Sequence, residues 1–512
     1  MKQVISTRAS GILLHVSSLP SPHGIGDIRH GFDFIDFLKE SGQAYWQILP
    51  LGPTCPVFGN SPYMSFSAFA GNPLFISPEL LLADRLLAPA DLVAPGFSAY
   101  LVEFERVAAW KEGLLAKAWQ RFRCQKNHGA FERFRDKSAW LPGYSLFMAL
   151  REKFGRTPWY EWPAEYRRAD RPAMLAAAAD LAERVDYYCF EQYLFHQQWQ
   201  ALRDHARRKG VRIIGDLPIY VAADSADVWA HQQIFDLHPT TRQPVHIAGV
   251  PPDYFSKTGQ RWGNPLYRWG TRKEAVKKQL SAWWRDRLAA AYCLVDIIRI
   301  DHFRGFEAYW SIPAEEATAE NGVWKKGPGL AFFQDIQSRL GPLPIIAEDL
   351  GIITPEVEEL RDRLGYPGMK ILQFAFDGRP DNPYLPFNYK KNFVVYTGTH
   401  DNDTSLGWYL DPGLAPAVRE TLRQALNKGE GEMRTVHHDL IHLALASVAV
   451  LAVIPMQDLL GFGNDCRMNR PGTSRGNWVW RCAPGYFTKE LAAWLHEQTR
   501  FFNRLNSGAA GA

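Results

Sequence analysis

The feature that most constrains this fold is a series of short apolar segments that recurs along the whole chain. Each is rich in valine, isoleucine or leucine, and several run into polar or acidic residues. The segments begin at residues 11, 45, 211, 295, 344, 368, 393 and 448. Such apolar runs are typical of strands that are buried on both faces, as in a parallel sheet. The sequence therefore predicts a parallel sheet of eight strands.

Helical patterns separate several of these segments. After the segment that starts at residue 344, Thr354 suits the cap of a helix, Pro355 its first position and Gly365 the residue past its end. Strands that alternate with helices predict an α/β fold, here a (β/α)8 TIM barrel with large, mainly helical insertions. An open doubly wound sheet is the alternative. Its dinucleotide-binding form is disfavoured because no G-x-G-x-x-G follows a strand.

The strands are unevenly spaced, which favours insertions in one barrel over separate modules. We expect residues 1–512 to form a single catalytic barrel. Residues 77–190, which include alanine-rich stretches, are expected to form a mainly helical insertion between the second and third strands. Residues 222–292 are expected to form another insertion, between the third and fourth strands. Its aromatic loop 251–265 is expected to cover the active site.

Composition and charge argue against several classes of function. The net charge is only +4, and the densest basic cluster, residues 203–209, lies at an expected helix end, so nucleic acid is not expected as a partner. The longest apolar stretch, 440–455, contains His442 and ends at Pro455. It is expected to form a buried helix followed by a buried strand, with no membrane as a partner.

The cysteines and the N-terminal residues indicate a compartment. The six cysteines are scattered and none forms a C-x-x-C pair, which is typical of reduced thiols. The first residues lack the apolar region of a secretory signal. These features predict a cytoplasmic protein, and they leave its oligomeric state open.

Acidic residues accompany four of the expected strands. Asp216, Asp301, Glu348 and Asp401 are placed at or just beyond the ends of their segments. In a β/α barrel these ends meet on one rim, where catalytic residues lie. Any one of these acids could instead pair with an arginine or cap a helix. Four on one rim favour a catalytic site.

Several carboxyl groups on one rim suit the cleavage of a glycosidic bond. One carboxylic acid protonates the leaving oxygen, and a second carboxylate can attack the anomeric carbon when the two groups lie about 5–5.5 Å apart. A third can stabilise developing positive charge or bind sugar hydroxyls. Arg299 should share a strand face with Asp301 and keep that carboxyl ionised. We expect burial and nearby acids to raise the pKa of Glu348, which must carry a proton.

The string HDND at residues 400–403 could also suggest a metal site. No H-x-x-x-H or facial-triad spacing accompanies it, so a histidine that binds sugar hydroxyls is the favoured interpretation. His15, at the end of the first expected strand, is equally compatible with a contact at the rim and with a place in the core.

Eight sequence motifs, taken together and in order, resemble one known family. They are GILLHVSSLPSPHGIGD, SPYMSFSAFAGNP, GDLPIYVAADSADVW, PDYFSKTGQRWGNPLY, IIRIDHFRGFEAYW, IIAEDLG, TGTHDNDT and RMNRPGTSRGNWVWR. The chain resembles the 4-α-glucanotransferases called amylomaltases or disproportionating enzymes, a branch of the α-amylase-like barrel enzymes. It departs from the family pattern at Arg261, where an apolar residue is common, and at Arg268, where an acid or amide is common.

The resemblance implies catalytic roles for three residues. Asp301 is expected to be the nucleophile, Glu348 the general acid/base and Asp401 the carboxylate that stabilises the transition state. No metal and no organic cofactor is implied. The implied substrate-binding residues are Tyr63, Asp216, Arg299 and His400 beside the scissile bond, Gln260 and Trp262 in the covering loop, and Asn469 on the acceptor side.

The expected function is therefore that of a retaining 4-α-glucanotransferase of starch, glycogen or maltose metabolism. Its partners would be maltooligosaccharides, amylose-like α-1,4-glucans and glucose as an acceptor, and the glucan would be carried on Asp301. An α-1,4-glucan hydrolase of the same barrel type is the alternative. A non-catalytic glycan-binding protein is disfavoured because the three catalytic carboxyl residues are intact.

Overall fold

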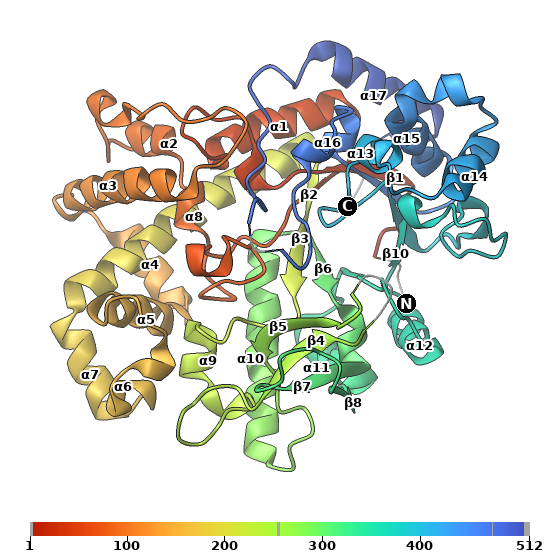
Figure 1. The fold of residues 1–512 in the computed structure, drawn as a ribbon. Helices are drawn as coiled ribbons and strands as arrows, with labels where there is room; N and C mark the ends of the chain where they lie inside the picture. Colours follow the sequence, from red (N-terminus) through yellow and green to blue (C-terminus); the bar gives the residue numbers. More distant parts are fainter. Residues whose placement is uncertain (1–3, 253–255, 474, 506–512) are drawn as a thin grey trace.

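A closed barrel of parallel strands forms the centre of the molecule. The computed structural model describes residues 4–252, 256–473 and 475–505. The eight strands follow the order β10-β11-β12-β1-β2-β3-β6-β9 (Figure 1). The backbone N–H of Ala347, at the end of β9, donates to the carbonyl oxygen of Pro367, just before β10, at 2.9 Å. Because the two ends of the sheet meet there, the predicted (β/α)8 barrel is confirmed and the open doubly wound sheet is excluded.

Each predicted strand is present. They are β1 (Ala9–Leu13), β2 (Tyr45–Gln47), β3 (Arg212–Pro218), β6 (Ile297–Asp301), β9 (Ile345–Ala347), β10 (Gly368–Ile371), β11 (Phe393–Tyr396) and β12 (Leu451–Pro455). All residues of β9, β11 and β12 are buried, which accounts for their unbroken apolar sequences.

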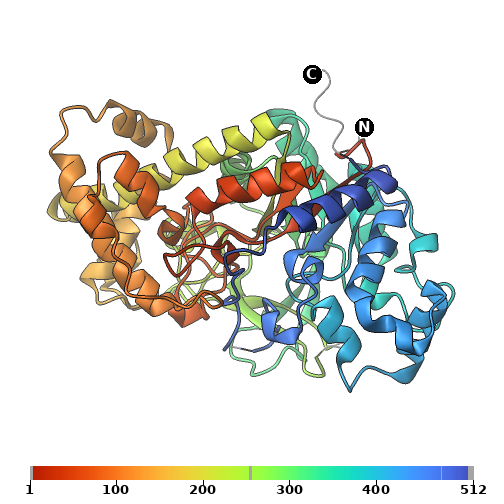
Figure 2. The same ribbon diagram turned by 90° about the horizontal axis from the view of Figure 1, so that it is seen from above.

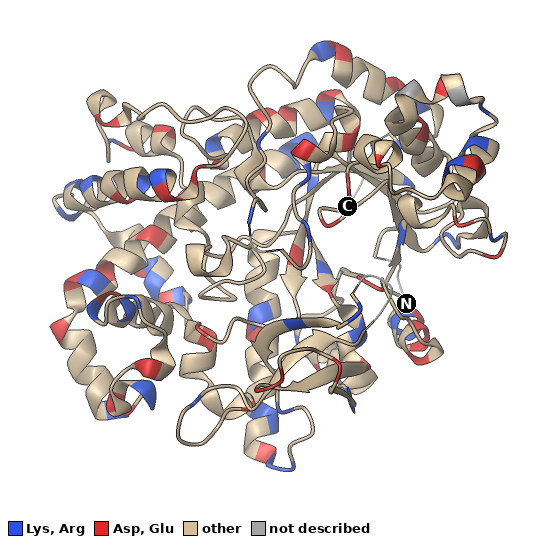
Figure 3. Cartoon of the chain, viewed as in Figure 1, with Lys and Arg blue, Asp and Glu red and all other residues tan. Residues whose placement is uncertain are grey.

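Helices cover the outside of the barrel, as Figure 2 shows from above. The long ones are α1 (Ile28–Glu40), α8 (Ala182–Lys209), α10 (Glu274–Leu294), α11 (Gly329–Leu340), α12 (Pro355–Leu364), α15 (Val436–Ala446) and α17 (Lys489–Phe501). The signals for α12 are confirmed: Thr354 is its cap, Pro355 starts it and Gly365 ends it with φ 71°. Acidic and basic side chains are interspersed along the outer helices (Figure 3).

A group of helices extends to one side of the barrel between β2 and β3. They are α2 (Pro78–Ala83), α3 (Phe104–Arg123), α4 (Gly129–Lys137), α5 (Leu141–Lys153), α6 (Ala164–Arg167) and α7 (Arg171–Asp180). Aromatic side chains join this group to the barrel helix α8. The rings of Phe122 on α3 and Phe190 on α8, for example, lie 4.7 Å apart between centroids. The proposed insertion 77–190 covers these helices, and its status as a unit stays a prediction.

A second, antiparallel sheet lies beside the ends of β3 and β6 (Figure 1). Its order is β5-β4-β7-β8, formed by β4 (His246–Val250), β5 (Gln260–Pro265), β7 (Ala308–Pro313) and β8 (Val323–Lys326). Residues 251–265 were expected to be a loop. Their second half is instead the strand β5, because it pairs with β4 from residue 260 onward. Residues 253–255 of the expected loop lie outside the described residues.

The longest apolar stretch is divided between two elements, as expected. Its first part lies in α15, and its last residues form β12 in the barrel wall. Within the described ranges, no helix has both the length and the apolar character needed to cross a membrane. The remaining α-helices are α9 (Ala226–Ala230), α13 (Ser405–Leu410), α14 (Pro416–Leu426) and α16 (Met456–Leu459).

Candidate active site

Two of the predicted catalytic carboxyl residues lie at the ends of neighbouring barrel strands. Asp301 is the last residue of β6, and Glu348 follows the last residue of β9 directly. The backbone N–H of His302 donates to Glu348 Oε2 at 2.7 Å, and that of Leu350 donates to Oε1 at 2.9 Å. Because His302 has a left-handed backbone, with φ 53°, the chain turns sharply after Asp301 and directs this N–H at Glu348. The turn therefore places Glu348 beside the residue that follows Asp301.

A buried ion pair between Arg299 and Asp216 lies next to Asp301. In the strand register Asp216 of β3 lies opposite Arg299 of β6. The Arg299 guanidinium pairs with Asp216 Oδ2 and also donates to Asp301 Oδ1 at 3.0 Å. Arg299 and Asp301 therefore share a strand face, as expected. Asp216 lies within β3 rather than at its end, because β3 continues to Pro218.

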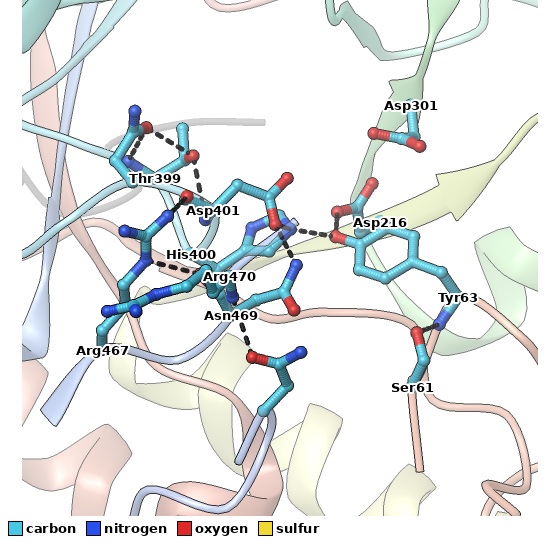
Figure 4. A network of polar contacts seen from close by, with 12 residues as sticks. Ser61, Tyr63, Asp216, Asp301, Thr399, His400, Asp401, Arg467, Asn469 and Arg470 are labelled. Atoms are coloured by element: carbon cyan, nitrogen blue, oxygen red, sulfur yellow. Dashed lines mark hydrogen bonds and ion pairs between the residues drawn. The ribbon is translucent and has the colours of Figure 1, made fainter. Parts of the chain in front are cut away.

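Tyr63 and His400 complete one wall of the site (Figure 4). The Tyr63 hydroxyl donates to Asp216 Oδ2 at 2.6 Å and lies 2.8 Å from His400 Nε2. Their rings are stacked, with centroids 5.3 Å apart. Burial lowers the pKa of His400, so the ring is neutral at pH 7. Since the single Tyr63 proton is directed at Asp216, His400 Nε2–H is the donor in the second contact.

Asp401 and Asn469 lie beside His400, whose Nε2 is 3.4 Å from Asp401 Oδ1. The side-chain amide of Asn469 donates to Asp401 Oδ1 at 2.6 Å, and its backbone N–H donates to the His400 carbonyl oxygen at 3.0 Å. The side chains of Asp401 and Asp301 are 45% and 32% exposed, whereas that of Asp216 is fully buried. The first two carboxylates can therefore contact a ligand directly, while Asp216 is part of the floor.

The strand β5 brings Trp262 and Gln260 to the same rim. The Trp262 ring meets the His302 ring edge to face, with centroids 4.9 Å apart, and its indole N–H donates to Gln260 Oε1 at 3.2 Å. Trp262 therefore lies next to the turn that follows Asp301. Arg261, one of the departures from the family pattern, is exposed and donates to the carbonyl oxygen of Ala314.

The carboxyl groups of the site shift one another's pKa values. Burial raises the pKa of Asp301 well above its usual range, Arg299 opposes the shift, and Asp216, Glu348 and Asp401 add to it. Burial also raises the pKa of Glu348, against Arg299 and the two backbone N–H donors. Two close carboxyls resist double ionisation, so the pair Asp301–Glu348 retains one proton where isolated carboxyls would have lost it. The direction for Glu348 agrees with expectation, whereas Asp301, expected to stay ionised, has a raised pKa as well.

The string HDND does not converge on one point. Asn402 Oδ1 accepts from the backbone N–H and the hydroxyl of Thr399, while Asp403 pairs with Arg467. In the described part of the chain, no group of three or more His, Cys, Asp or Glu side chains is arranged to hold a metal ion. His15 is buried and accepts the backbone N–H of Leu49 at 3.3 Å, which places it in the core.

Three polar residues of the site were not identified from the sequence. Asp458, in α16 just beyond β12, accepts from the hydroxyl of Thr397 and the backbone N–H of Ser405, at 2.5 and 2.6 Å. Arg467 and Asp403 form an ion pair behind Asp401. The signals were present: Asp458 follows an apolar strand as the other acids do, and Arg467 is part of the motif that contains Asn469.

Comparisons with known proteins agree on one family. A family model described as 4-alpha-glucanotransferase matches residues 14–488. A 4-alpha-glucanotransferase of Thermus thermophilus is 48% identical over 508 residues, which cover 97% of this chain and 99% of the relative. One from Synechocystis sp. is 47% identical over 512 residues, covering 98% of both.

Solved structures extend this agreement to the fold. An amylomaltase from Streptococcus agalactiae, solved in complex with acarbose, superposes with a TM-score of 0.92 at 38% identity and covers 97% of this chain and 99% of its own. The amylomaltase from Corynebacterium glutamicum has a TM-score of 0.74 at 19% identity, covering 98% of this chain and 75% of its own, and is similar in fold.

Proposed function

The chain belongs to the 4-α-glucanotransferase family, and from this premise we propose that it transfers glucan by double displacement with Asp301 as the nucleophile. The 4-α-glucanotransferase activity and the α-1,4-glucan substrates follow from the family. The assignment of residues to steps rests on geometry. The observation that carries it is the placement of Asp301 and Glu348 on adjacent strands, the first paired with Arg299 and the second with the backbone N–H of His302.

In the first step the Asp301 carboxylate attacks the anomeric carbon of the bound donor. The bond from that carbon to the glycosidic oxygen breaks, and Glu348 gives its proton to this oxygen, which leaves as a hydroxyl group. Arg299 supports the ionised form of Asp301 through its direct hydrogen bond. The raised pKa of Glu348 keeps that residue protonated for the step.

The floor of the site is suited to hold the sugar ring during this step. The fully buried Asp216 carboxylate accepts from the Tyr63 hydroxyl and pairs with Arg299, and so holds these two side chains beneath the sugar. Tyr63 and His400 present a stacked, uncharged wall beside it. The partly exposed Asp401 carboxylate supplies negative charge where the oxocarbenium-like transition state becomes positive.

In the second step a sugar hydroxyl of the acceptor attacks the same carbon. Glu348, now ionised, removes the proton of that hydroxyl, the new glycosidic bond forms and the ester bond to Asp301 breaks. Two inversions at one carbon leave the α-configuration unchanged. Asn469, next to Asp401, is assigned to the acceptor side, and glucose is the smallest acceptor that we propose.

Transfer must compete with attack by water. Trp262 and Gln260 on β5 lie beside the turn after Asp301, where they can cover the bound glucan. A bound acceptor in attack geometry then has a large effective concentration relative to water. The six unpaired cysteines support our proposal that this chemistry takes place in the cytoplasm, in starch, glycogen or maltose metabolism.

Incubation with maltotriose tests the proposed function. The wild-type enzyme is expected to give glucose and a ladder of products longer than maltotriose, whereas a hydrolase gives glucose and maltose alone. Asp301→Asn is expected to abolish turnover while the dissociation constant for maltotriose stays within about tenfold. Turnover by Asp301→Asn equal to that of the wild type, or products of inverted configuration, would contradict the assignment of the nucleophile.

A further inference from the structure

Asp401 is held differently from the other two catalytic carboxyl residues. Asp301 ends a strand and Glu348 follows one directly, so the barrel wall itself fixes their positions. Residues 397–400 separate Asp401 from the end of β11, and they form no helix or strand. A carboxylate on such a segment needs contacts from elsewhere in the chain to keep one position.

Arg467 makes three such contacts with its guanidinium group, and Figure 4 shows those to Asp401 and Asn469. Arg467 Nη1 forms an ion pair with Asp403, and Nη2 donates to the backbone carbonyl oxygen of Asp401. Arg467 Nε donates to the backbone carbonyl oxygen of Asn469 at 2.7 Å. The Arg467 side chain is only 16% exposed, so these contacts are largely shielded from water.

The same two segments also meet on the side that faces the cleft. The Asn469 side chain donates to the Asp401 carboxylate, and its backbone N–H donates to the His400 carbonyl oxygen. Arg467 therefore contacts the backbone of both residues of the Asp401–Asn469 pair, and in Figure 4 it lies on the side of Asp401 away from Asp301. Its position determines how Asn469 and Asp401 face each other.

We propose that Arg467 is a positioning residue for the transfer reaction, acting through Asp401 and Asn469. It joins residues 400–403 to residues 467–469, so that the carboxylate of Asp401 and the amide of Asn469 approach the bound glucan as one unit. The inference rests on the proposed role of Asp401. Because Asn469 contacts Asp401 and is also assigned to the acceptor side, Arg467 connects the transition-state carboxylate with the acceptor site.

The two ends of the segment that carries Asp401 are held by separate hydrogen bonds. Asp458 binds Thr397 and Ser405 on either side of residues 398–404. Loss of Arg467 would therefore release the middle of the segment, which carries Asp401, while its two ends stay attached to the barrel. This arrangement makes the proposal testable in a folded enzyme.

The test compares Arg467→Met with Arg470→Met in the full-length enzyme. Arg470 is an exposed neighbour in the same loop, so it serves as a matched control. Arg467→Met is expected to lower kcat with maltotriose by roughly 10- to 100-fold, because a small misplacement of a catalytic group is costly. Arg470→Met is expected to stay within about twofold of the wild type. Thermal melting shows whether each variant is folded.

A double-mutant cycle separates positioning from a structural role. With maltosyl fluoride as an activated donor, the rates of Arg467→Met, Asp401→Ala and the double variant are compared. If Arg467 acts through Asp401, adding Arg467→Met to Asp401→Ala should cost no more than about twofold. Arg467→Lys, which keeps a charge opposite Asp403 but not the planar set of donors, should recover part of the loss.

Two results would overturn the proposal. One is a wild-type kcat in the Arg467→Met variant. The other is an effect of Arg467→Met on the Asp401→Ala background that is as large as its effect on the wild-type enzyme. Failure of the proposed function itself would look different, because the wild-type enzyme would then make no products longer than maltotriose.

Discussion

At the scale of single residues, Asp301 and Glu348 differ in what holds them. Asp301 receives a hydrogen bond from Arg299, which stays charged throughout the reaction. Within the described residues, Glu348 accepts only from backbone N–H groups, which carry no net charge. Arg299 lowers the pKa of both carboxyl groups, but of the two it donates a hydrogen bond directly to Asp301. In the proposed mechanism, Glu348 is the member of the pair whose proton leaves and returns in each cycle.

The pH dependence of kcat/KM follows from these contacts. In the proposed mechanism, activity requires ionised Asp301 and protonated Glu348, so it is lost in acid when Asp301 takes up a proton and in alkali when Glu348 loses one. Burial raises the pKa of both groups. Both limbs of the profile are thus expected above the ordinary carboxyl values of about 3.9 and 4.3. Initial rates with maltotriose across the pH range measure them.

The control for this prediction is Glu348→Gln, assayed with maltosyl fluoride because its leaving group needs no proton from the enzyme. This variant can no longer lose a proton at residue 348, so the alkaline limb should disappear from its profile. An unchanged alkaline limb in Glu348→Gln would assign that limb to another group.

At the scale of elements, the pairing of β4 with β5 places Trp262 at the rim. The two strands approach so closely at Gly249 that a Cβ atom there would lie 2.1 Å from the backbone carbonyl oxygen of Gln260. Only a residue without a side chain permits this approach. A single glycine on β4 therefore determines where the covering residues on β5 lie.

Gly249→Ala is expected to displace β5 and weaken the cover over the active site. Water should then reach the glucan on Asp301 more often, and the ratio of hydrolysis to transfer should rise by roughly threefold or more. The ratio is obtained by measuring the new reducing ends that hydrolysis releases together with the longer products that transfer forms.

Gly113→Ala is the matched control, because Gly113 lies within α3 and a Cβ atom there has no neighbour within 4 Å. It should leave the ratio of hydrolysis to transfer unchanged. Equal ratios in Gly249→Ala and the wild type would show that the position of β5 does not control water.

At the scale of the whole molecule, one buried arginine joins distant parts of the chain. Arg504 follows α17 and is fully buried. Its guanidinium donates to the carbonyl oxygens of Ala9, Leu445 and Ala449, at 2.8, 2.7 and 2.9 Å. These oxygens belong to β1, to α15 and to the segment before β12, so Arg504 connects both ends of the described chain to the barrel.

Arg504→Met is expected to destabilise the fold without changing the chemistry. It removes the Arg504 donor from several buried carbonyl oxygens, at a cost of about 3 kcal/mol in the free energy of unfolding. In a chain of this size the melting temperature should fall by roughly 3 °C. The kcat of the folded enzyme should stay at the wild-type value, because Arg504 is remote from Asp301.

Arg500→Met on α17 serves as the comparison. The Arg500 side chain is exposed and pairs with Glu497 on the same helix, so the melting temperature of the variant should stay within about 1 °C of the wild type. Similar melting temperatures for Arg504→Met and Arg500→Met would contradict the structural role of Arg504.

Local sequence patterns determined the barrel strands, the ends of α12 and the acids at the strand ends. A strand buried on both faces must be apolar, and a helix cap requires particular residues at adjacent positions, so both can be recognised from neighbours in the chain. The strand β5 was missed because its pairing with β4 depends on a contact across the intervening loop.

Only the tertiary structure decided which polar groups share a contact. The pairing of Arg299 with Asp216 depends on the register between β6 and β3, and that of Arg467 with Asp403 depends on how two loops meet. The same holds for the pKa of Asp301, which is set by burial and by charges from other strands. Residue types determine which chemistry is available. The distances between these side chains, and hence the energies of their interactions, are set by residues far away in the chain.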